Sequence, residues 1–267
     1  MIERRIAYLR PDQVIAEMEN RSITYLPLGP LEWHGPHLPM GVDAFNAEKV
    51  AHLAAEETGG LVLPTFYWGT ERERSQQMLE WLGFSEEKWI IGMDFPANSL
   101  PGMYAAEEIF ALLIREQLLL VQRMGFRLIV IVSGHAAENH ITVLERLALE
   151  FSAESPFEVI LVLPFVRNEQ DIMEVGHASK VETSVMLALH PETVELHFLP
   201  PKNESLRNVD YAIVDYMTFL GQPTRDRTVA EYDDPRTASA EIGLSNIRLA
   251  TAQIVERVNQ VYKEHVE

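Results

Sequence analysis

A chain of 267 residues with 47% hydrophobic residues is long enough to form one large α/β domain with a substantial core. Its 22 Lys and Arg against 40 Asp and Glu give a net charge of -18, which argues against nucleic acid and anionic membranes as partners, because both attract clustered cations. Cysteine is absent, which excludes disulfides and thiolate chemistry, so a metal site must use His, Asp and Glu.

The N-terminal residues form no apolar segment of the signal-peptide type. No apolar run reaches the roughly 18 residues that a membrane-spanning helix needs. We therefore expect a soluble protein of the cytoplasm.

Apolar residues alternate along the chain between continuous runs, which predict buried strands, and helical spacing. Strand and helix patterns that alternate in this way are typical of a parallel sheet covered by helices on both faces. We predict a three-layer α/β/α sandwich with a mostly parallel sheet, formed as one domain over residues 1–267. Strands are expected at 23–28, 61–64, 128–132 and 159–164, and helices at 11–19, 44–58, 104–124, 140–153 and 238–263. Residues 176–184 are expected to open a further helix that runs to about 190.

Two segments lack a regular period. Residues 75–103 are rich in tryptophan and phenylalanine, and we interpret them as an insertion or lid. Such a segment either lines a pocket, forms an oligomer contact, or is a satellite hydrophobic cluster under a loop. Residues 195–238 are expected to be irregular.

The first predicted strand runs into a polar, proline-rich loop. After the apolar residues 23–28, the chain supplies Glu32, His34 and Asp43, with Gly41 allowing a turn. In an extended segment alternate side chains point the same way, so Glu32 and His34 share one side. Carboxylate and imidazole ligands suit zinc and manganese. These residues alone also fit a polar loop whose side chains meet solvent.

Further polar groups follow later predicted elements. His135 and Glu138 come just after the buried strand 128–132, at the place where open α/β sheets bind ligands. Glu182 falls in the first turn of a predicted helix, where a carboxylate stabilises the helix dipole without any metal. A ligand role and a purely structural role for Glu182 both remain open at this point.

The order of these motifs resembles the creatininase (creatinine amidohydrolase) family. Its opening Leu-Pro-x-Gly-x-x-Glu-x-His-Gly-x-His-Leu-Pro is matched at 26–39, with the following acid at Asp43. Further matches span nearly the whole chain: Pro101-Gly102, Gly125-Phe126-Arg127, Gly134-His135, His177 to Ser184, Asp234-Pro235-Arg236 and Glu241-Ile242-Gly243.

The resemblance implies a two-metal hydrolase, often a hexamer, that acts on a small-molecule substrate. Glu32 and His34 would each bind one metal, Asp43 would bridge both, and His135 would bind on the Glu32 side. One further carboxylate is needed, and we rank Glu182 ahead of Glu138, with the other orienting water or substrate. The implied cofactors are two divalent metal ions, either zinc, manganese or iron.

His177 lies in the His-Ala-x-x-x-Glu-Thr-Ser match and titrates near neutral pH, so we expect it to be the catalytic general acid/base. His37 lies in the first motif, but two ligating histidines so close on a proline-bounded loop are hard to arrange. We therefore expect His37 to support the ligands. Four further histidines are interpreted as bystanders: His52, His140, His190 and His197.

The chain departs from the family pattern at several positions. Ser133 replaces Asn before Gly-His, Ala136-Ala137 replaces Gly-Gly, and Ser179 replaces Gly after His-Ala. Residues 71–74, Glu-Arg-Glu-Arg, lack the His often found there. The expected metal ligands match while the expected substrate-facing residues differ, so creatinine is not a secure substrate.

We weigh three functions. The first is hydrolysis of a small cyclic amide or formamide by a metal-bound hydroxide. The alternative is ring opening of a diketo-inositol by C–C hydrolysis, of the 3-dehydro-scyllo-inosose type, in which Arg72 and Arg74 would address a polyhydroxylated or anionic substrate. Pairing with Glu71 and Glu73 is the simpler role for these arginines. The third function is a binding or assembly protein that kept the fold and lost turnover.

Overall fold

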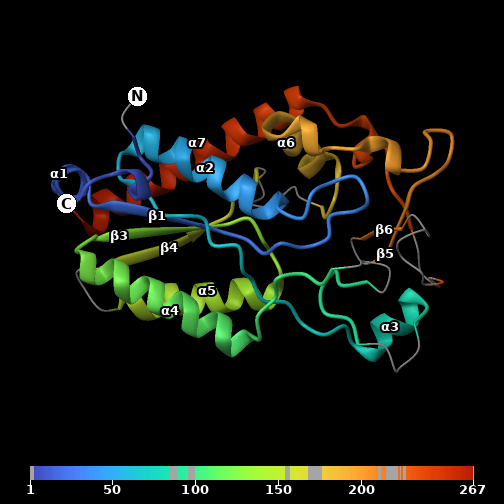
Figure 1. The fold of residues 1–267 in the computed structure, drawn as a ribbon, viewed down its shortest axis with the longest axis horizontal. Coiled ribbons are helices and arrows are strands. Elements are labelled where there is room, and N and C mark those ends of the chain that lie inside the picture. The colour runs from blue at the N-terminus through green and yellow to red at the C-terminus, as the bar shows by residue number, and fades with distance from the viewer. Residues whose placement is uncertain are drawn as a thin grey trace.

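The fold is a parallel sheet between two layers of helices, as the alternating pattern predicted (Figure 1). The strands lie in the order β2-β1-β3-β4, and neighbouring strands run parallel. They are β1 (Ile23–Leu28), β2 (Leu61–Val62), β3 (Leu128–Ser133) and β4 (Glu158–Val162). The computed structural model describes residues 3–84, 89–95, 100–153, 157–167, 176–209, 212–214, 222, 224 and 227–266.

Each face of the sheet has its own hydrophobic core. Along β3, Val130 packs into one core while Ile129 and Ile131 pack into the other, because successive side chains of a strand point to opposite faces. Both faces are apolar, which explains why β3 reads as a continuous run of Ile, Leu and Val. The first core is covered by α2 (Val42–Thr58), α6 (Lys180–Leu189) and α7 (Ala240–His265), and the second by α1 (Pro11–Asn20), α4 (Glu107–Met124) and α5 (Glu138–Ser152).

After β1 and β3, the polypeptide turns toward opposite faces of the sheet. β1 leads into α2 on one face of the sheet, whereas its neighbour β3 leads into α5 on the other face. This divergence opens a crevice at the carboxyl ends of the two strands, which is where open α/β sheets bind ligands. The loops that carry the predicted metal ligands therefore meet at one place.

Short elements occupy both segments that lack a period in the sequence. Within 75–103, α3 (Gln76–Leu82) begins at a Ser75 cap that accepts a hydrogen bond from Met78 N, and ends at Gly83 in the left-handed conformation. The expectation that 195–238 is irregular is wrong in part, because this region contains a small antiparallel sheet. Its strands are too short for a periodic pattern: β5 (Arg207–Val209), β6 (Ala212–Val214) and β7 (Arg227–Thr228), in the order β6-β5-β7.

The described part of 75–103 forms a satellite hydrophobic cluster. Leu79, Leu82, Ile90 and Phe95 are buried together there, and Trp33 packs against them. The rings of Trp33 and Phe95 meet edge to face with centroids 5.7 Å apart. The segment thus contacts the loop that follows β1.

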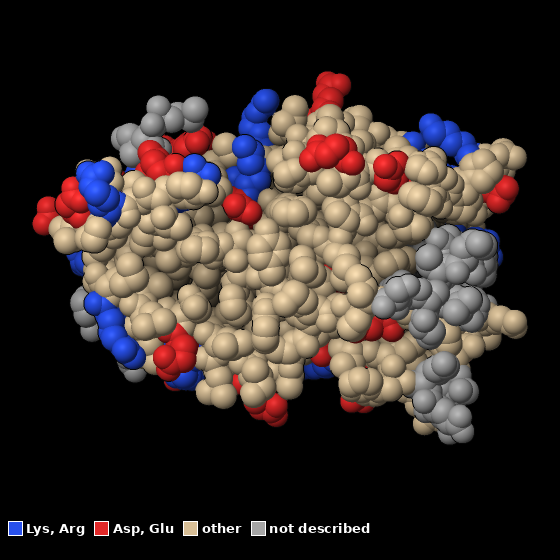
Figure 2. Space-filling model, viewed as in Figure 1, with Lys and Arg blue, Asp and Glu red and all other residues tan. Residues whose placement is uncertain are grey.

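The open edge of the sheet at β4 lies in a groove of about 820 Å³ between α5 and α7. Figure 2 shows an uncharged band across the middle of the molecule in this view, with charged side chains mostly above and below it. Ser152 Oγ accepts from Val159 N at 2.9 Å and donates to Val159 O at 3.1 Å, which satisfies part of the exposed strand edge. Among the described residues, no helix is long and apolar enough to cross a membrane.

Candidate metal centre

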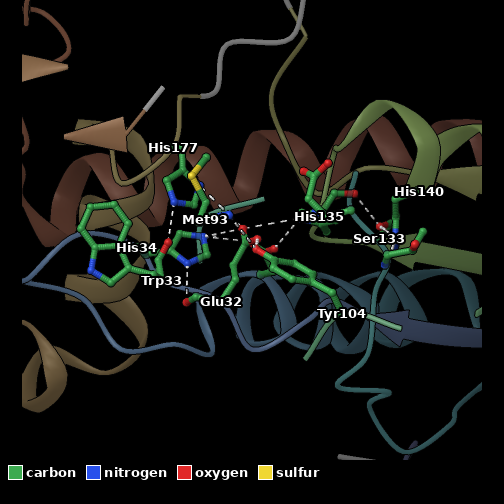
Figure 3. A network of polar contacts seen from close by, with 12 residues as sticks. Glu32, Trp33, His34, Met93, Tyr104, Ser133, His135, His140 and His177 are labelled. Carbon is green, nitrogen blue, oxygen red and sulfur yellow. Dashed lines mark hydrogen bonds and ion pairs between the residues drawn. The ribbon is translucent and has the colours of Figure 1, made fainter. Parts of the chain in front are cut away.

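Asp43 turns its two carboxylate oxygens toward two different histidines. Oδ1 lies 3.0 Å from His34 Nε2, and Oδ2 lies 3.1 Å from His135 Nδ1 (Figure 3 shows both histidines). Asp43 sits in the first turn of α2, His34 in the loop after β1, and His135 in the loop after β3. A carboxylate placed in this way is suited to bridge two cations.

Two groups of donors form around this shared aspartate. One consists of Glu32, Asp43 and His135, and the other of His34, Asp43 and Glu182; within each group the donor atoms lie within 4.8 Å of one another. All five residues are buried. Carboxylate and imidazole donors in this number suit zinc, manganese or iron, so the side chains present fit the two divalent metal ions expected from the sequence.

Glu32 and His34 point to the same side of their extended loop, as the alternation predicted. His34 Nε2 lies 3.5 Å from Glu32 Oε1, while Trp33 points into the hydrophobic cluster on the other side. Tyr104 supports Glu32 by donating its hydroxyl hydrogen to Oε2 at 2.5 Å. No sequence motif points to Tyr104, which lies 72 positions from Glu32.

The two carboxylates that competed for the last ligand position lie in different environments. Glu182 is buried in the first turn of α6, where Oε2 accepts from Ala178 N at 2.5 Å and Oε1 lies 3.9 Å from His34 Nε2. Glu138 begins α5 with its side chain 87% exposed, and lies 3.9 Å from Arg72. The structure therefore brings Glu182, and not Glu138, into the cluster of donors.

Four of the five donors line a pocket of about 420 Å³, namely Glu32, Asp43, His135 and Glu182. Glu71 and Glu138 contribute further carboxylates to its wall, and the described residues that line it include no Lys or Arg. Arg74 instead donates to Gly92 O at 2.9 Å. The lining residues are Glu32, Asp43, Glu71, Met93, Gly134, His135, Ala136, Ala137, Glu138, Phe165, Gly176, His177 and Glu182.

A family model named Creatininase and described as creatinine amidohydrolase matches residues 7–258. The chain belongs to the creatininase family.

Individual proteins and solved structures are also similar to this chain. A creatinine amidohydrolase from Pseudomonas putida is 26% identical over 261 residues, which cover 90% of each chain. A 3-dehydro-scyllo-inosose hydrolase from Thermotoga maritima is 25% identical over 192 residues, or 67% of this chain and 54% of that protein. Among solved structures, a zinc–zinc creatininase variant has a TM-score of 0.70 at 21% identity, and a manganese creatininase has 0.69 at 21%; each match covers both chains completely and shows the shared fold.

Burial opposes charge throughout the centre, but the buried groups stabilise each other. Burial by itself lowers the pKa of His34, yet the carboxylates of Asp43, Glu182 and Glu32 together outweigh this effect and raise it to about 10. Against the same cost of burial, Glu32 and Asp43 raise the pKa of His135 well above its usual value. Burial would raise the pKa of Glu32, but the charges of His135 and His34 hold it well below its ordinary range. Burial raises the pKa of Glu182 to about 8. In the cation-free protein, protons therefore occupy donor atoms to which metal ions would bind.

His177 lies beside the donors with its ring fixed. Its Nε2 donates to the backbone oxygen of Trp33 at 2.6 Å, which leaves the Nδ1 lone pair facing Glu32 Oε1 at 3.6 Å. The ring stacks on His34 with centroids 4.3 Å apart. Burial and the neighbouring His34 lower the pKa of His177 to about 4, so the ring is neutral at pH 7.

His37 lies outside the donor groups and joins the loop after β1 to α6. Its Nε2 is 2.9 Å from Thr183 Oγ1, next to Glu182, and its ring is buried. Burial lowers the pKa of His37 to about 3 and keeps it uncharged. This placement agrees with a supporting role.

The interpretation of His140 as a bystander does not fit the structure. His140 is completely buried, and its Nε2 lies 3.0 Å from Ser133 Oγ, two residues before His135. A sequence signal existed, since Ser133 replaces the usual family Asn and His140 follows in the next helix. Two other predicted bystanders pair with neighbouring acids: the partly exposed His190 with Glu192, and the exposed His197 with Glu195.

The other departures from the creatininase pattern also have identifiable positions. Ser179 caps α6 by accepting from Val181 N at 3.2 Å, a role that favours Ser over Gly. Ala136 and Ala137 line the pocket, where they fill space that the family's glycines would leave open. The ligand-bearing positions thus keep the family pattern while the pocket wall changes.

Proposed function

We propose that this protein is a hydrolase of a small cyclic amide or formamide that depends on two divalent metal ions. The observation that carries the proposal is the position of Asp43, whose two oxygens each face a histidine from a different loop. Glu32, Asp43 and His135 would hold one ion, and His34, Asp43 and Glu182 the other. Zinc and manganese are supported by the zinc–zinc and manganese creatininases that share this fold, and iron suits the same donors.

When bound, the two ions supply an activated water and a Lewis acid for the carbonyl group. His177 acts as the general base and then as the general acid. Its Nε2–H is engaged by Trp33, so the free Nδ1 accepts a proton from the attacking water and delivers it to the leaving nitrogen. One C–O bond forms, the C–N bond breaks, and the amine leaves neutral. Glu138, at the pocket wall, orients the substrate.

The composition of the pocket supports a substrate rich in N–H donors. Its ionisable side chains, among the described residues, are carboxylates and imidazoles. Because Glu32, Asp43, His135 and Glu182 would hold the ions, Glu71 and Glu138 are the carboxylates left to accept hydrogen bonds from ring N–H groups of the substrate. A small cyclic amide supplies such groups.

A second candidate is C–C ring opening of a diketo-inositol, favoured by the similarity to the Thermotoga maritima hydrolase. The two arginines that were expected to address such a substrate contact other groups. Arg72 lies 3.9 Å from Glu138, and Arg74 donates to Gly92 O, outside the pocket lining. We therefore rank C–N hydrolysis first.

The test combines elemental analysis of the purified protein with a hydrolysis screen of creatinine, formamidopyrimidines, small lactams and diketo-inositols. We expect two metal ions per chain and turnover of a C–N substrate. Protein that contains no zinc, manganese or iron and takes none up would overturn the proposal in favour of a binding protein. We further propose a homo-oligomer on the strength of the family resemblance alone, and light scattering measures its size. The cytoplasmic location stays a prediction from the sequence.

A further inference from the structure

We propose that Ser133 and His140 are positioning residues that fix the loop carrying His135 and thereby set the affinity of one of the two cation sites. The inference rests on the proposed function, in which His135 is a ligand. It concerns residues that the family pattern does not assign to the metal centre.

A chain of hydrogen bonds leads from the loop after β2 to His135. Thr70 N donates to His140 Nδ1 at 3.3 Å. A neutral imidazole that accepts at Nδ1 carries its hydrogen on Nε2, so His140 donates to Ser133 Oγ at 3.0 Å. The Ser133 hydroxyl in turn donates to His135 O at 2.8 Å (Figure 3). Every hydrogen in this chain therefore has one defined direction.

The residues of this chain of hydrogen bonds are shielded from water, so water cannot replace a lost partner. Thr70, Ser133 and His140 are each 0% exposed. Phe110 stacks on the His140 ring with centroids 4.7 Å apart, and the His135 ring meets His140 edge to face at 4.9 Å. A buried donor that loses its acceptor here is left unsatisfied, so the loop must shift when a member is removed.

The chain of hydrogen bonds reaches only one of the two donor groups. It ends on the backbone of His135, which belongs with Glu32 and Asp43. The other group gains its separate donors from the loop after β1 and from α6, through His34 and Glu182. Loss of the chain therefore weakens the His135 side and leaves the His34 side intact.

Two substitutions of His140 distinguish its contact with Thr70 from its contact with Ser133. His140→Gln keeps a donor near the position of Nε2 and loses the acceptor for Thr70 N. His140→Asn keeps an acceptor near the position of Nδ1 but is too short to reach Ser133. Since the Ser133 end holds the His135 loop, His140→Asn has the larger effect and resembles Ser133→Ala.

The experiment measures the two stepwise affinities for Zn²⁺ and Mn²⁺ by calorimetry on the full-length protein. In Ser133→Ala and His140→Asn, we expect one affinity to fall about 10-fold to 100-fold, the usual effect of losing a group that orients a metal ligand. The other affinity stays within about 2-fold, and the double variant binds no more weakly than either single one. The control is Ser22→Ala, which removes the Ser22 Oγ acceptor for Arg127 N, 3.0 Å away, at the opposite end of β3, and changes neither affinity.

A second readout needs no bound metal. Amide hydrogen exchange over 133–139 in the cation-free protein rises in Ser133→Ala and not in Ser22→Ala. Equal loss of both affinities, additive effects in the double variant, or unchanged affinities and exchange would overturn the positioning role. Wild-type protein that binds no cation refutes the proposed function instead, while the exchange measurement still decides whether the chain holds the loop.

Discussion

Gly134 lies directly against the backbone of Asp43. A Cβ at position 134 would stand 2.0 Å from the carbonyl oxygen of Asp43, closer than any real contact. Gly29 makes a similar approach, with a Cβ position 2.6 Å from that of Asp43. The ends of β1 and β3 thus close on the start of α2, and this close packing brings Asp43 between the two loops.

Gly134→Ala is expected to displace Asp43 and to lose both metal ions, because both donor groups share that residue. Elemental analysis and thermal unfolding measure the result. Gly125→Ala is the control: Gly125 ends α4 at a φ of +97°, so the change costs about 1 kcal/mol of stability away from the site. Gly134→Ala protein with full metal content would contradict the role of this contact.

Glu182→Gln and Glu138→Gln distinguish the two candidate ligands. Glu182 is buried beside His34, whereas the side chain of Glu138 is exposed. We expect Glu182→Gln to lose one metal ion per chain, and Glu138→Gln to keep both and change mainly KM. The reverse pattern of metal content would make Glu138 the ligand.

Glu32→Gln and His34→Ala each remove a donor from a different group. We expect loss of metal and of activity in both, because an ion that loses one of its few protein ligands binds more weakly. Activity retained by either variant is incompatible with the proposed ligand set.

His177→Ala is expected to reduce kcat about 10²-fold to 10⁴-fold, the usual contribution of a general acid/base, with the metal content unchanged. Single-turnover kinetics and elemental analysis on the same sample measure both quantities. If the metal is lost as well, His177 acts as a ligand, which its place beside Glu32 and His34 would permit.

Cation binding is expected to release protons and to tighten as the pH rises. In the cation-free protein the pKa of His34 is raised to about 10 and that of Glu182 to about 8, so both groups carry protons at pH 7. A metal ion needs these donors deprotonated, so each proton must leave before or during binding. The affinity therefore rises between about pH 7 and the raised pKa values, and is lost as the pH falls.

Calorimetry in two buffers with different ionisation enthalpies measures the protons released at pH 7. Glu138→Gln provides the control, since its exposed side chain does not belong to the donor groups. Binding that releases no proton and does not change with pH would show that the cluster is already deprotonated without metal.

The predicted elements agree with the structure where the pattern is long. The apolar runs of β1 and β3 and the helical spacing of α2 and α7 gave correct elements, because burial on one or both faces imposes a period. The small sheet β6-β5-β7 escaped prediction because strands of two or three residues are too short to show a period. α3 escaped because its seven residues span only about two helical turns. For α3, the cap at Ser75 was the available signal.

The sequence alone determined which chemical groups this protein has available, and it placed the ends of β1 and β3 to within one residue. These groups are His, Asp and Glu without Cys, and they gather just after those two strands. Only the tertiary structure decided which of them meet. Asp43 and His135 lie 92 positions apart, and their contact depends on strand register and on the close packing of α2 at Gly134. The same holds for the choice between Glu182 and Glu138 and for the link from His140 to His135. Sequence spacing fixes the side of a strand or helix, but the direction from which two distant elements approach is set by the packing of the two cores.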